Sequence, residues 1–474
     1  HRLGRWPMVL VFGGLLFVFL DLQAAPENWT YAIVILGACI VVAAAFWQRL
    51  AILTCITVGT FYVASLPRSS ASIQVSEESA SGNVPNASAL PPLLHVILDE
   101  QWGIGGLLAE KDTATAAFLS EFYLSRGFEL FPAAYSRYDR TRESIPQLVS
   151  LGERTRLDSA ANTSPPRYTL SSIPYFEVLR SRGYRIRVYQ TSYLDHCAAP
   201  NAQVVSCETQ EGNSIANIGY LPGNWIERAE LAGRFFLNVS SHIYRRLHPD
   251  PVSWRRANAG GGLLTLQRAR DAIASQSVAG TAYFVHVLLP HRPATVDEQC
   301  GARADEPPVR QPGLGLNDEG WRWTIQRSGW QIRCTHRALG DVITGLERAA
   351  GSAGAIIIVH GDHGSRMFQR DLGVPAVAAL DGRQLNGFYS TLLAVRRPSV
   401  PPRIFSEPVP VQDFIWAFAR SGFARLPNAG WRHFVYGPPT PAIRSDTVRF
   451  LTELEMLWVS TPQRALTDSS TRAR

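Results

Sequence analysis

Residues 356–364 read Ile-Ile-Ile-Val-His-Gly-Asp-His-Gly, an apolar run that stops abruptly on an acid and an imidazole between glycines. The run is short, apolar and rich in β-branched residues, which is typical of a central strand in a parallel sheet. Ligands bind beyond the carboxyl ends of such strands, so Asp362 and His363 would lie in the ligand crevice. A polar turn after a strand is the alternative, and this motif alone does not exclude it.

A second strand-like run, Leu93–Leu98, also ends on acids, Asp99 and Glu100, before a glycine-containing loop. Two apolar strands are thus each followed by acids, and this repetition favours the ligand-crevice interpretation over a polar turn. A third run, Tyr283–Leu289, contains His286 and leads into Pro290-His291-Arg292-Pro293, where the prolines hold the loop rigid beside one imidazole. A lone histidine is usually structural, but His291 also follows the end of a strand.

The fourth segment, residues 131–148, is a strand-like piece followed by Thr141, which is placed to open a helix. A threonine at a helix N-terminus is most often an N-cap, and Thr141 with Ser144 and the following apolar residues fits that interpretation. The same position also suits a nucleophile. Free backbone N–H groups and the helix dipole stabilise an incoming phosphate or sulfate, and a metal held by nearby acids lowers the hydroxyl pKa.

The order of these four segments resembles the alkaline phosphatase and sulfatase superfamily. More closely, it is similar to the membrane-anchored branch that contains lipoteichoic acid synthases and phosphoethanolamine transferases. The residues that carry the resemblance are Val96–Asp99, Thr141 with Ser144–Pro146, His286–His291 and Gly361–Gly364. The resemblance covers most of residues 91–400 and implies an α/β fold with a mixed, mainly parallel central sheet flanked by helices.

The resemblance also implies roles for the site residues. By it, Asp99, Asp362 and His363 bind a divalent metal, and Thr141 is the metal-bound nucleophile that becomes transiently phosphorylated. His291 would lie beside the transferred group or the leaving group. Acids with an imidazole suit zinc or manganese, whereas an all-oxygen shell would suit magnesium or calcium better.

The sequence departs from the family pattern at three places. The membrane transferases carry Glu at the first acidic position, so Asp99 followed by Glu100 leaves open which carboxylate binds the metal. Ser365-Arg366 follow the last motif, where an acid is common, so we expect a different substrate pocket. Sulfatases need a Cys/Ser-x-Pro-x-Arg sequence for formylglycine, and its absence around Thr141 argues against sulfate-ester hydrolysis by the usual route.

The formal charge is +7, yet no basic run or aromatic-interleaved patch indicates nucleic acid. A membrane phospholipid or an anionic glycan is the better partner for a basic external protein. Nearly all of the cations are arginines, which suit bidentate phosphate contacts. His286 is a further candidate for substrate contact. The arginines near the predicted site loops are Arg137, Arg140, Arg142, Arg292 and Arg366.

Three apolar stretches precede residue 70, roughly residues 6–20, 31–47 and 50–66, each near or slightly below the length that spans a bilayer. Arginines lie before the first and between the second and third, so the positive-inside rule places everything after Leu66 outside. We expect anchoring in a bacterial inner membrane with a periplasmic catalytic domain. A cleaved signal peptide is a poor alternative, because it would need only one apolar stretch and three are present. The chain lacks an initiator Met, so further spans before residue 1 are left open.

The chain then divides into a transmembrane region of three helices (1–68), a linker (69–92), a catalytic domain (93–400) and a C-terminal elaboration with a tail (401–474). Alternating helix and strand signals predict an α/β fold. Among them, the patterns indicate helices at Tyr175–Arg182, Ala338–Ala350 and Val411–Ala419, and a strand at Tyr184–Gln190.

Four cysteines fall in the external part. Cys197 lies close in sequence to Cys207, and Cys300 to Cys334, so two local disulfides are expected in an oxidising compartment. A zinc site is the weaker interpretation, because no Cys-x-x-Cys pair occurs.

The leading hypothesis is a metal-dependent transferase. It would move a phospho-substituent of the phosphoethanolamine or phosphoglycerol type from a phospholipid donor to an envelope glycan or lipid acceptor, because a tethered enzyme reaches a lipid donor best. The alternatives are a sulfatase-like hydrolase or phosphodiesterase and, from a different class, an inactive partner in surface polysaccharide assembly.

Overall fold

The computed structural model of the protein describes residues 90–151, 157–159, 168–210, 217, 221–222, 226, 228, 230, 258–303, 310–311, 315–316, 318–365, 377–427, 430–437 and 447–451. The transmembrane region expected at 1–68 and nearly all of the expected linker lie outside these ranges, so both stay predictions. Within the described ranges, no helix is both long enough and apolar enough to cross a bilayer.

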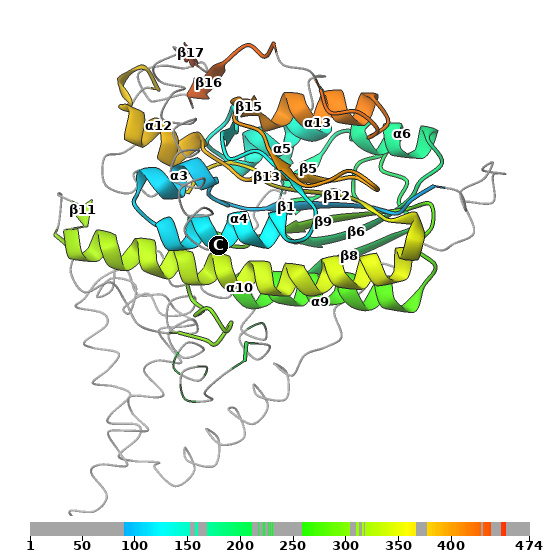
Figure 1. The fold of residues 1–474 in the computed structure, drawn as a ribbon, viewed down its shortest axis with the longest axis horizontal. Coiled ribbons are helices and arrows are strands. Elements are labelled where there is room, and N and C mark those ends of the chain that lie inside the picture. Colours follow the sequence, from blue (N-terminus) through cyan, green and yellow to red (C-terminus); the bar gives the residue numbers. More distant parts are fainter. Residues whose placement is uncertain are drawn as a thin grey trace, which may run out of the picture.

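A large mixed sheet forms the centre of the fold (Figure 1). Among the strand pairs of this sheet that the structure describes, only those that involve β13 run antiparallel. This is the mainly parallel sheet that we predicted. In spatial order the strands are β14 (Arg403–Ile404), β2 (Glu129–Leu130), β13 (Leu393–Arg396), β12 (Ile356–Gly361), β1 (Leu93–Leu98), β9 (Thr281–Val287), β6 (Arg185–Thr191) and β8 (Ser206–Gln210).

The three apolar runs read from the sequence are the three adjacent central strands β12, β1 and β9. Leu98 lies opposite Gly361 on one side and opposite Val287 on the other. All three strands point the same way, so the residues that follow them emerge together at one edge of the sheet. This register brings the motifs of three distant segments to one place.

The sheet is covered on both faces, as Figure 1 shows. Leu94 and Val96 pack into one core, whereas Leu93 and Ile97 pack into the other, because successive strand residues point to opposite faces. Each fully buried aliphatic side chain contributes about 1.5–3 kcal/mol. One layer holds α4 (Thr113–Leu124), α9 (Asn258–Ser275) and α10 (Asp318–Ala350), and the other α5 (Thr141–Val149), α6 (Pro174–Ser181) and α13 (Val411–Arg420).

Short elements complete the described fold. Residues 401–420, expected in a C-terminal elaboration, contribute β14 to the sheet and α13 to one helical layer. The remaining elements are α3 (Ile104–Ala109), β3 (Ala134–Tyr135), β4 (Leu157–Ser159), β5 (Tyr168–Leu170), β7 (Leu194–Asp195), β10 (Arg310–Gln311), β11 (Gly315–Leu316), η6 (Gly351–Ala353), η7 (Val377–Ala379), α12 (Gly382–Tyr389), β15 (Val409–Pro410), β16 (Phe434–Gly437) and β17 (Thr447–Phe450).

Helix α10 is much longer than expected. The sequence predicted a helix from Ala338, but α10 begins at Asp318 and runs for 33 residues. Its first half contains Gly329, which disfavours a helix by propensity. A Cβ atom at Gly329 would lie 2.5 Å from Thr115 Oγ1, so the glycine lets α10 pass close to the start of α4. Tertiary packing here outweighs local propensity.

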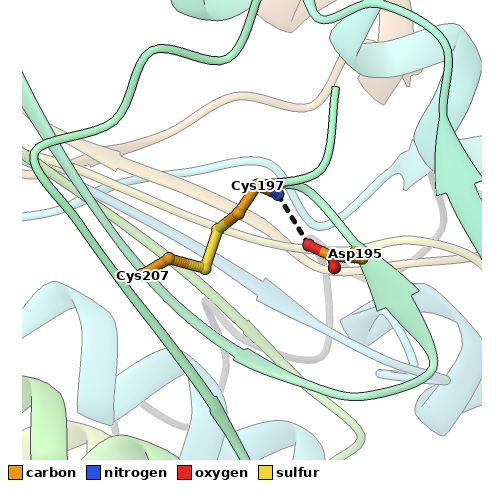
Figure 2. Close-up of side chains that lie close together, drawn as sticks. All are labelled: Asp195, Cys197 and Cys207. Atoms are coloured by element: carbon orange, nitrogen blue, oxygen red, sulfur yellow. Dashed lines mark hydrogen bonds between the residues drawn. A yellow bond between two sulfur atoms is a disulfide. The ribbon is translucent and has the colours of Figure 1, made fainter. Parts of the chain in front are cut away.

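Both expected disulfides are present, Cys197–Cys207 and Cys300–Cys334. The first joins the turn after β7 to β8, where the Cys197 backbone N–H donates to Asp195 Oδ1 at 2.8 Å (Figure 2). Asp195 and the two sulfurs lie close enough for a metal, but the sulfurs are bonded to each other. They are therefore unavailable as thiolate ligands.

Tyr123 and His336 join α4 to α10 inside the core. His336 Nδ1 lies 2.9 Å from the Ile332 carbonyl oxygen and therefore carries the proton, which leaves Nε2 to accept from the Tyr123 hydroxyl, also at 2.9 Å. Burial lowers the pKa of His336 to about 4. The folded protein thus holds this imidazole neutral.

We predict that His336 makes the fold acid-sensitive. Below about pH 6.5 the unfolded chain binds a proton here and the folded protein does not, so the free energy of unfolding falls by up to about 1.4 kcal/mol per pH unit until about pH 4. Urea unfolding at about pH 7.5, 5.5 and 4.5 should give a shallower pH dependence for His336→Gln than for wild type. Tyr123→Phe is the control, since it lowers stability but keeps the slope. Equal slopes for wild type and His336→Gln would contradict the assignment.

Candidate active site

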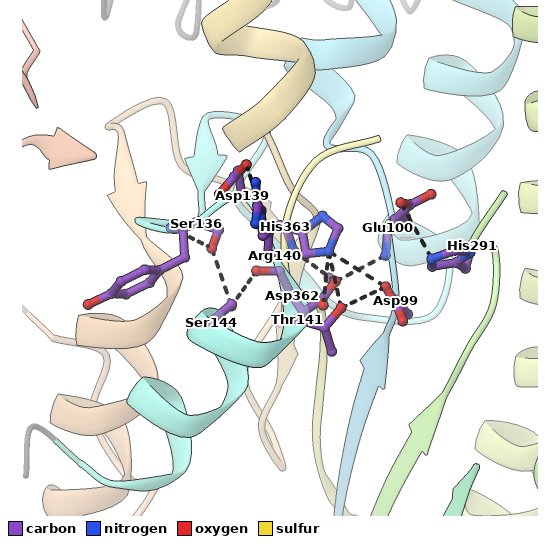
Figure 3. A network of polar contacts seen from close by, with 12 residues as sticks. Asp99, Glu100, Ser136, Asp139, Arg140, Thr141, Ser144, His291, Asp362 and His363 are labelled. Carbon is purple, nitrogen blue, oxygen red and sulfur yellow. Dashed lines mark hydrogen bonds and ion pairs between the residues drawn. The ribbon is translucent and has the colours of Figure 1, made fainter. Parts of the chain in front are cut away.

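The residues that follow β1 and β12 lie together at the carboxyl edge of the sheet (Figure 3). One carboxylate oxygen each from Asp99 and Asp362 and one ring nitrogen of His363 lie within 4.8 Å of one another. The three side chains are buried, with Asp99 and Asp362 each 1% exposed and His363 0% exposed. The structure therefore brings together the three residues that were predicted to bind a metal.

Thr141 is the first residue of α5 and lies beside this group. Its Oγ1 is 3.2 Å from Asp99 Oδ1, to which it donates, and 3.2 Å from His363 Nε2. The N-cap of α5 is Arg140, and no side chain caps the helix there. The interpretation of Thr141 as an N-cap is therefore wrong, and its hydroxyl faces the predicted metal ligands instead.

Ser144 and Gln412 hold α5 in this position. Ser144 Oγ donates to the backbone carbonyl of Asp362 at 2.5 Å and accepts from Gln412 Nε2 at 2.9 Å. Gln412 belongs to α13, so three segments meet through two side chains. The sequence included Ser144 in the motif but gave no signal for Gln412, which comes close only in the folded chain.

Two glycines permit the tight packing around Asp362 and His363. A Cβ atom at Gly361 would lie 2.2 Å from Thr391 Oγ1 and 2.7 Å from the Gln101 carbonyl oxygen. At Gly364 it would lie 2.4 Å from the Gly387 carbonyl oxygen. No side chain fits at either position, which explains why glycines flank the acid and the imidazole.

Hydrogen bonds fix how His363 is presented. Its Nδ1 lies 2.7 Å from the Gly364 carbonyl oxygen and so donates a proton there. In the neutral imidazole, Nε2 then presents a lone pair toward Thr141 and the two acids, at 3.4 Å from Asp362 Oδ2 and 3.7 Å from Asp99 Oδ1. A backbone carbonyl that holds the distal nitrogen is the usual way to orient a histidine ligand.

The group fits a divalent cation. Two buried carboxylates beside one imidazole leave negative charge that is costly without a counter-ion. Asp362 Oδ2 is buried and has no hydrogen-bond partner among the described residues. Two oxygen donors and one nitrogen donor suit zinc or manganese. Asp99, Asp362 and His363 would hold the ion, with the Thr141 hydroxyl adjacent.

The side chains of the two consecutive acids, Asp99 and Glu100, point to different places. Glu100 adopts a left-handed backbone conformation with φ of 56°, and its N–H donates to Asp362 Oδ1 at 3.0 Å. Its carboxylate accepts from the Arg292 backbone N–H at 3.1 Å and lies 3.5 Å from His291 Nε2 (Figure 3). Asp99 is thus the acid within the ligand group, and Glu100 faces the loop that carries His291.

The predicted substrate-binding residues lie in different environments. His286 is 0% exposed, and its Nδ1 is 3.1 Å from His196 Nε2. It is therefore a buried histidine on β9, and its predicted contact with substrate stays a prediction. Arg292 lies 3.5 Å from Glu100. Arg142 pairs with the neighbouring Glu143 at 2.6 Å, and Arg366 lies outside the described residues.

We did not predict from the sequence the pair of buried histidines, His95 and His360, that lies beneath the site. His360 Nδ1 donates to the Gly361 carbonyl at 2.8 Å, so its Nε2 accepts from His95 Nε2, also at 2.8 Å. His95 Nδ1 then accepts from the Tyr175 hydroxyl at 2.8 Å. Burial lowers the pKa of His95 and lowers that of His360 to about 4. This chain of bonds ends at the residue before Asp362.

No family model and no curated protein sequence matches the chain. Solved structures are similar to it. They include the phosphonate monoester hydrolase SpPMH from Silicibacter pomeroyi (15% identity, 73% of this chain and 79% of that chain covered, TM-score 0.41). BT1596, a 2-O GAG sulfatase, has 13% identity, with 70% of each chain covered and a TM-score of 0.44.

The C-terminal periplasmic domain of EcEptC from Escherichia coli, in complex with Zn, has 10% identity over 70% of this chain and 82% of that domain, with a TM-score of 0.39. Each of these three structures shares 15% identity or less with this chain.

We predict that Asp362 and Glu100 differ in their effect on metal binding. Asp362→Asn should weaken binding of zinc or manganese by at least about tenfold, because it removes a charged ligand. Glu100→Gln should leave metal affinity nearly unchanged, since its carboxylate faces His291 and Arg292. Metal content after equilibrium dialysis, measured by mass spectrometry, tests both variants. A comparable loss in Glu100→Gln would make Glu100 a ligand.

Proposed function

We propose that the protein is a metal-dependent transferase. It moves a phospho-substituent, of the phosphoethanolamine or phosphoglycerol type, from a phospholipid to an envelope glycan or lipid. The observation that carries the proposal is the position of Thr141 Oγ1, 3.2 Å from both Asp99 Oδ1 and His363 Nε2 at the start of α5. A hydroxyl used only for helix capping would lie elsewhere.

The first half of the reaction forms a covalent intermediate. Thr141 Oγ1 attacks the phosphorus of the lipid phosphodiester, the Oγ1–P bond forms, and the bond to the diacylglycerol oxygen breaks. The hydrogen bond to Asp99 orients the attacking oxygen, and Asp99 Oδ1 takes up the Thr141 proton as the Oγ1–P bond forms. A bound divalent metal would neutralise charge on the transferred group and lower the hydroxyl pKa. The first backbone N–H groups of α5, which no helical bond uses, favour the same anionic group.

His291 is suited to protonate the leaving group. Its Nδ1 donates to the Arg292 carbonyl at 2.5 Å, and its Nε2 faces Glu100 Oε1 at 3.5 Å. The Glu100 carboxylate stabilises the imidazolium, so Nε2 can carry the proton that the diacylglycerol oxygen takes up. In the second half, the acceptor hydroxyl returns a proton to the imidazole as it attacks the phosphothreonine. The Oγ1–P bond breaks, and Thr141 is regenerated as its oxygen takes a proton back from Asp99.

The compartment forms part of the proposal. Two disulfides support a catalytic domain that folds outside the cytoplasm, in an oxidising environment. The apolar stretches within residues 1–68 would anchor it in the bacterial inner membrane beside its lipid donor. A phosphodiesterase on the same residues would share the first half of the reaction and use water in the second, and the test below separates the two.

Thr141 is predicted to be essential and to carry the adduct. Incubated with vesicles of phosphatidylethanolamine and phosphatidylglycerol, wild type should release diacylglycerol and gain the mass of the headgroup phosphate on the peptide that contains Thr141. Thr141→Ala should lose at least about a thousandfold in rate and show no adduct, whereas Thr141→Ser should keep a measurable fraction because it retains a hydroxyl.

The outcomes distinguish the candidate functions. An adduct that discharges faster with added glycan or lipid acceptor supports transfer. An adduct that discharges to water at one rate, whatever acceptor is offered, would favour the phosphodiesterase. Unchanged diacylglycerol release by Thr141→Ala would remove Thr141 from the mechanism. Bound metal with no turnover of any phospholipid would leave the inactive partner as the better account.

A further inference from the structure

A cleft of about 1350 Å³ lies beside the first half of α10, where that helix passes the turn between α3 and α4 and the start of α12. None of the described residues that were predicted for the active site lines it. The described lining includes three tryptophans, Trp321, Trp323 and Trp330, all from α10. Each is only partly buried, so large aromatic surfaces face an open cleft.

The three indole rings are held in place from behind. Arg327 is 1% exposed, and its guanidinium lies 5.3 Å from the ring centre of Trp323 and 5.0 Å from that of Trp330. Trp321 Nε1 donates to Glu110 Oε2 at 3.1 Å. Since cation–π contacts and a hydrogen bond fix the rings, a ligand would meet rigid aromatic faces and little ordering entropy would be lost on binding.

The charges around the cleft balance. Four acids and four cations line its described part, and several are already paired with each other. Glu110 accepts from Arg383 Nε at 2.7 Å, and Glu298 lies 3.3 Å from Arg333. A nucleic acid or another polyanion requires a net positive surface, which the described part of this lining does not present. An acyl chain requires an apolar lining, which these charged groups do not provide.

A neutral, polyhydroxylated ligand matches this lining. A pyranose ring presents one flat apolar face of C–H groups, which packs on an indole, whereas its hydroxyls donate to carboxylates and accept from guanidinium groups. The lining alternates these elements along α10, with Glu319 and Arg322 beside Trp321 and Trp323. Several indoles in one cleft suit several consecutive sugar rings.

The cleft is connected to the proposed active site through Gln331, the residue after Trp330. Gln331 Nε2 donates to the carbonyls of Pro290 and His291, at 3.0 and 2.9 Å. Its Oε1 accepts from the Thr295 backbone N–H at 2.8 Å. The same turn of α10 therefore lines the cleft and holds the loop that carries His291.

We propose that this cleft binds a neutral oligosaccharide, with Trp321, Trp323 and Trp330 as the stacking platforms. Binding itself is independent of the proposed function. The additional statement that the bound sugar chain is the acceptor of the phospho-substituent rests on the proposed function.

The test uses the full chain in detergent or nanodiscs, titrated with maltohexaose, cellohexaose or laminarihexaose and followed by tryptophan fluorescence and calorimetry. We expect saturable binding of at least one of these, weakened at least about tenfold in Trp323→Ala and in Trp330→Ala. Trp323→Phe should retain part of the affinity, because a flat ring remains.

Trp416→Ala is the matched control. Trp416 is also partly buried and has a guanidinium, that of Arg420, 4.3 Å from its ring centre, but it lies on α13 in the opposite helical layer. It should leave sugar affinity unchanged. No binding of any hexaose, equal loss in the control, or wild-type affinity in both cleft variants would each overturn the proposal. Preferred binding of an anionic oligosaccharide or of phospholipid headgroup would also overturn it.

Adduct formation from phospholipid, measured on the same samples, separates the two proposals. The cleft variants should still form the Thr141 adduct at the wild-type rate, which also shows that they are folded, and should discharge it to the hexaose at least about tenfold more slowly. If wild type binds a hexaose but forms no adduct, the transferase proposal is contradicted and the oligosaccharide site still stands. Adduct formation and discharge unaffected by both cleft variants would remove the acceptor role.

Discussion

The repulsion between two buried carboxylates, Asp99 and Asp362, is the constraint on which the rest of the site depends. Neighbouring donor groups each offset that charge. The backbone N–H groups of Glu100 and His363 both donate to Asp362 Oδ1, at 3.0 and 2.8 Å. The Thr141 hydroxyl donates to Asp99. The left-handed conformation of Glu100 aims its N–H at Asp362 and, in consequence, turns its carboxylate to the His291 loop. One electrostatic requirement thus positions the proposed nucleophile, Thr141, and the proposed acid, His291, together.

The sheet register makes this concentration of charge possible. Parallel pairing of Leu98 with Gly361 places both acids one residue beyond the last paired position. Close packing follows, since Gly361 and Gly364 leave no room for side chains. Below this layer, the bonds from Tyr175 through His95 to His360 hold the end of β12 from the core side. The site is therefore supported from the apolar interior as well as from the loops.

The sequence predicted the parts of this arrangement that local pattern encodes. Three apolar runs became adjacent strands, and the acids and imidazole at their ends came together, because the carboxyl ends of parallel strands share one edge of a sheet. Other contacts depend on the fold and leave no local signal. Gln412 reaches Ser144 across 268 positions. The apolar runs also contain three histidines, His95, His286 and His360. The one local signal for two of them is spacing, since His95 lies on the same strand face as Asp99, and His360 on the same face as Asp362. The first half of α10 was missed because glycine and polar residues hide its period.

The residues of the candidate active site and those of the tryptophan cleft come from separate stretches of the chain. The acids, His363 and Thr141 come from strand ends and the start of α5, whereas the tryptophan cleft is built mainly from the first half of one helix. At about 1.5 Å per residue, the 33 residues of α10 form a rod about 50 Å long whose second half belongs to the core. Substitutions on its exposed first turns can change the proposed ligand of the cleft without disturbing Asp99, Asp362 or His363. This separation makes the protein evolvable, because descendants can acquire a new ligand preference in steps that each preserve the reaction.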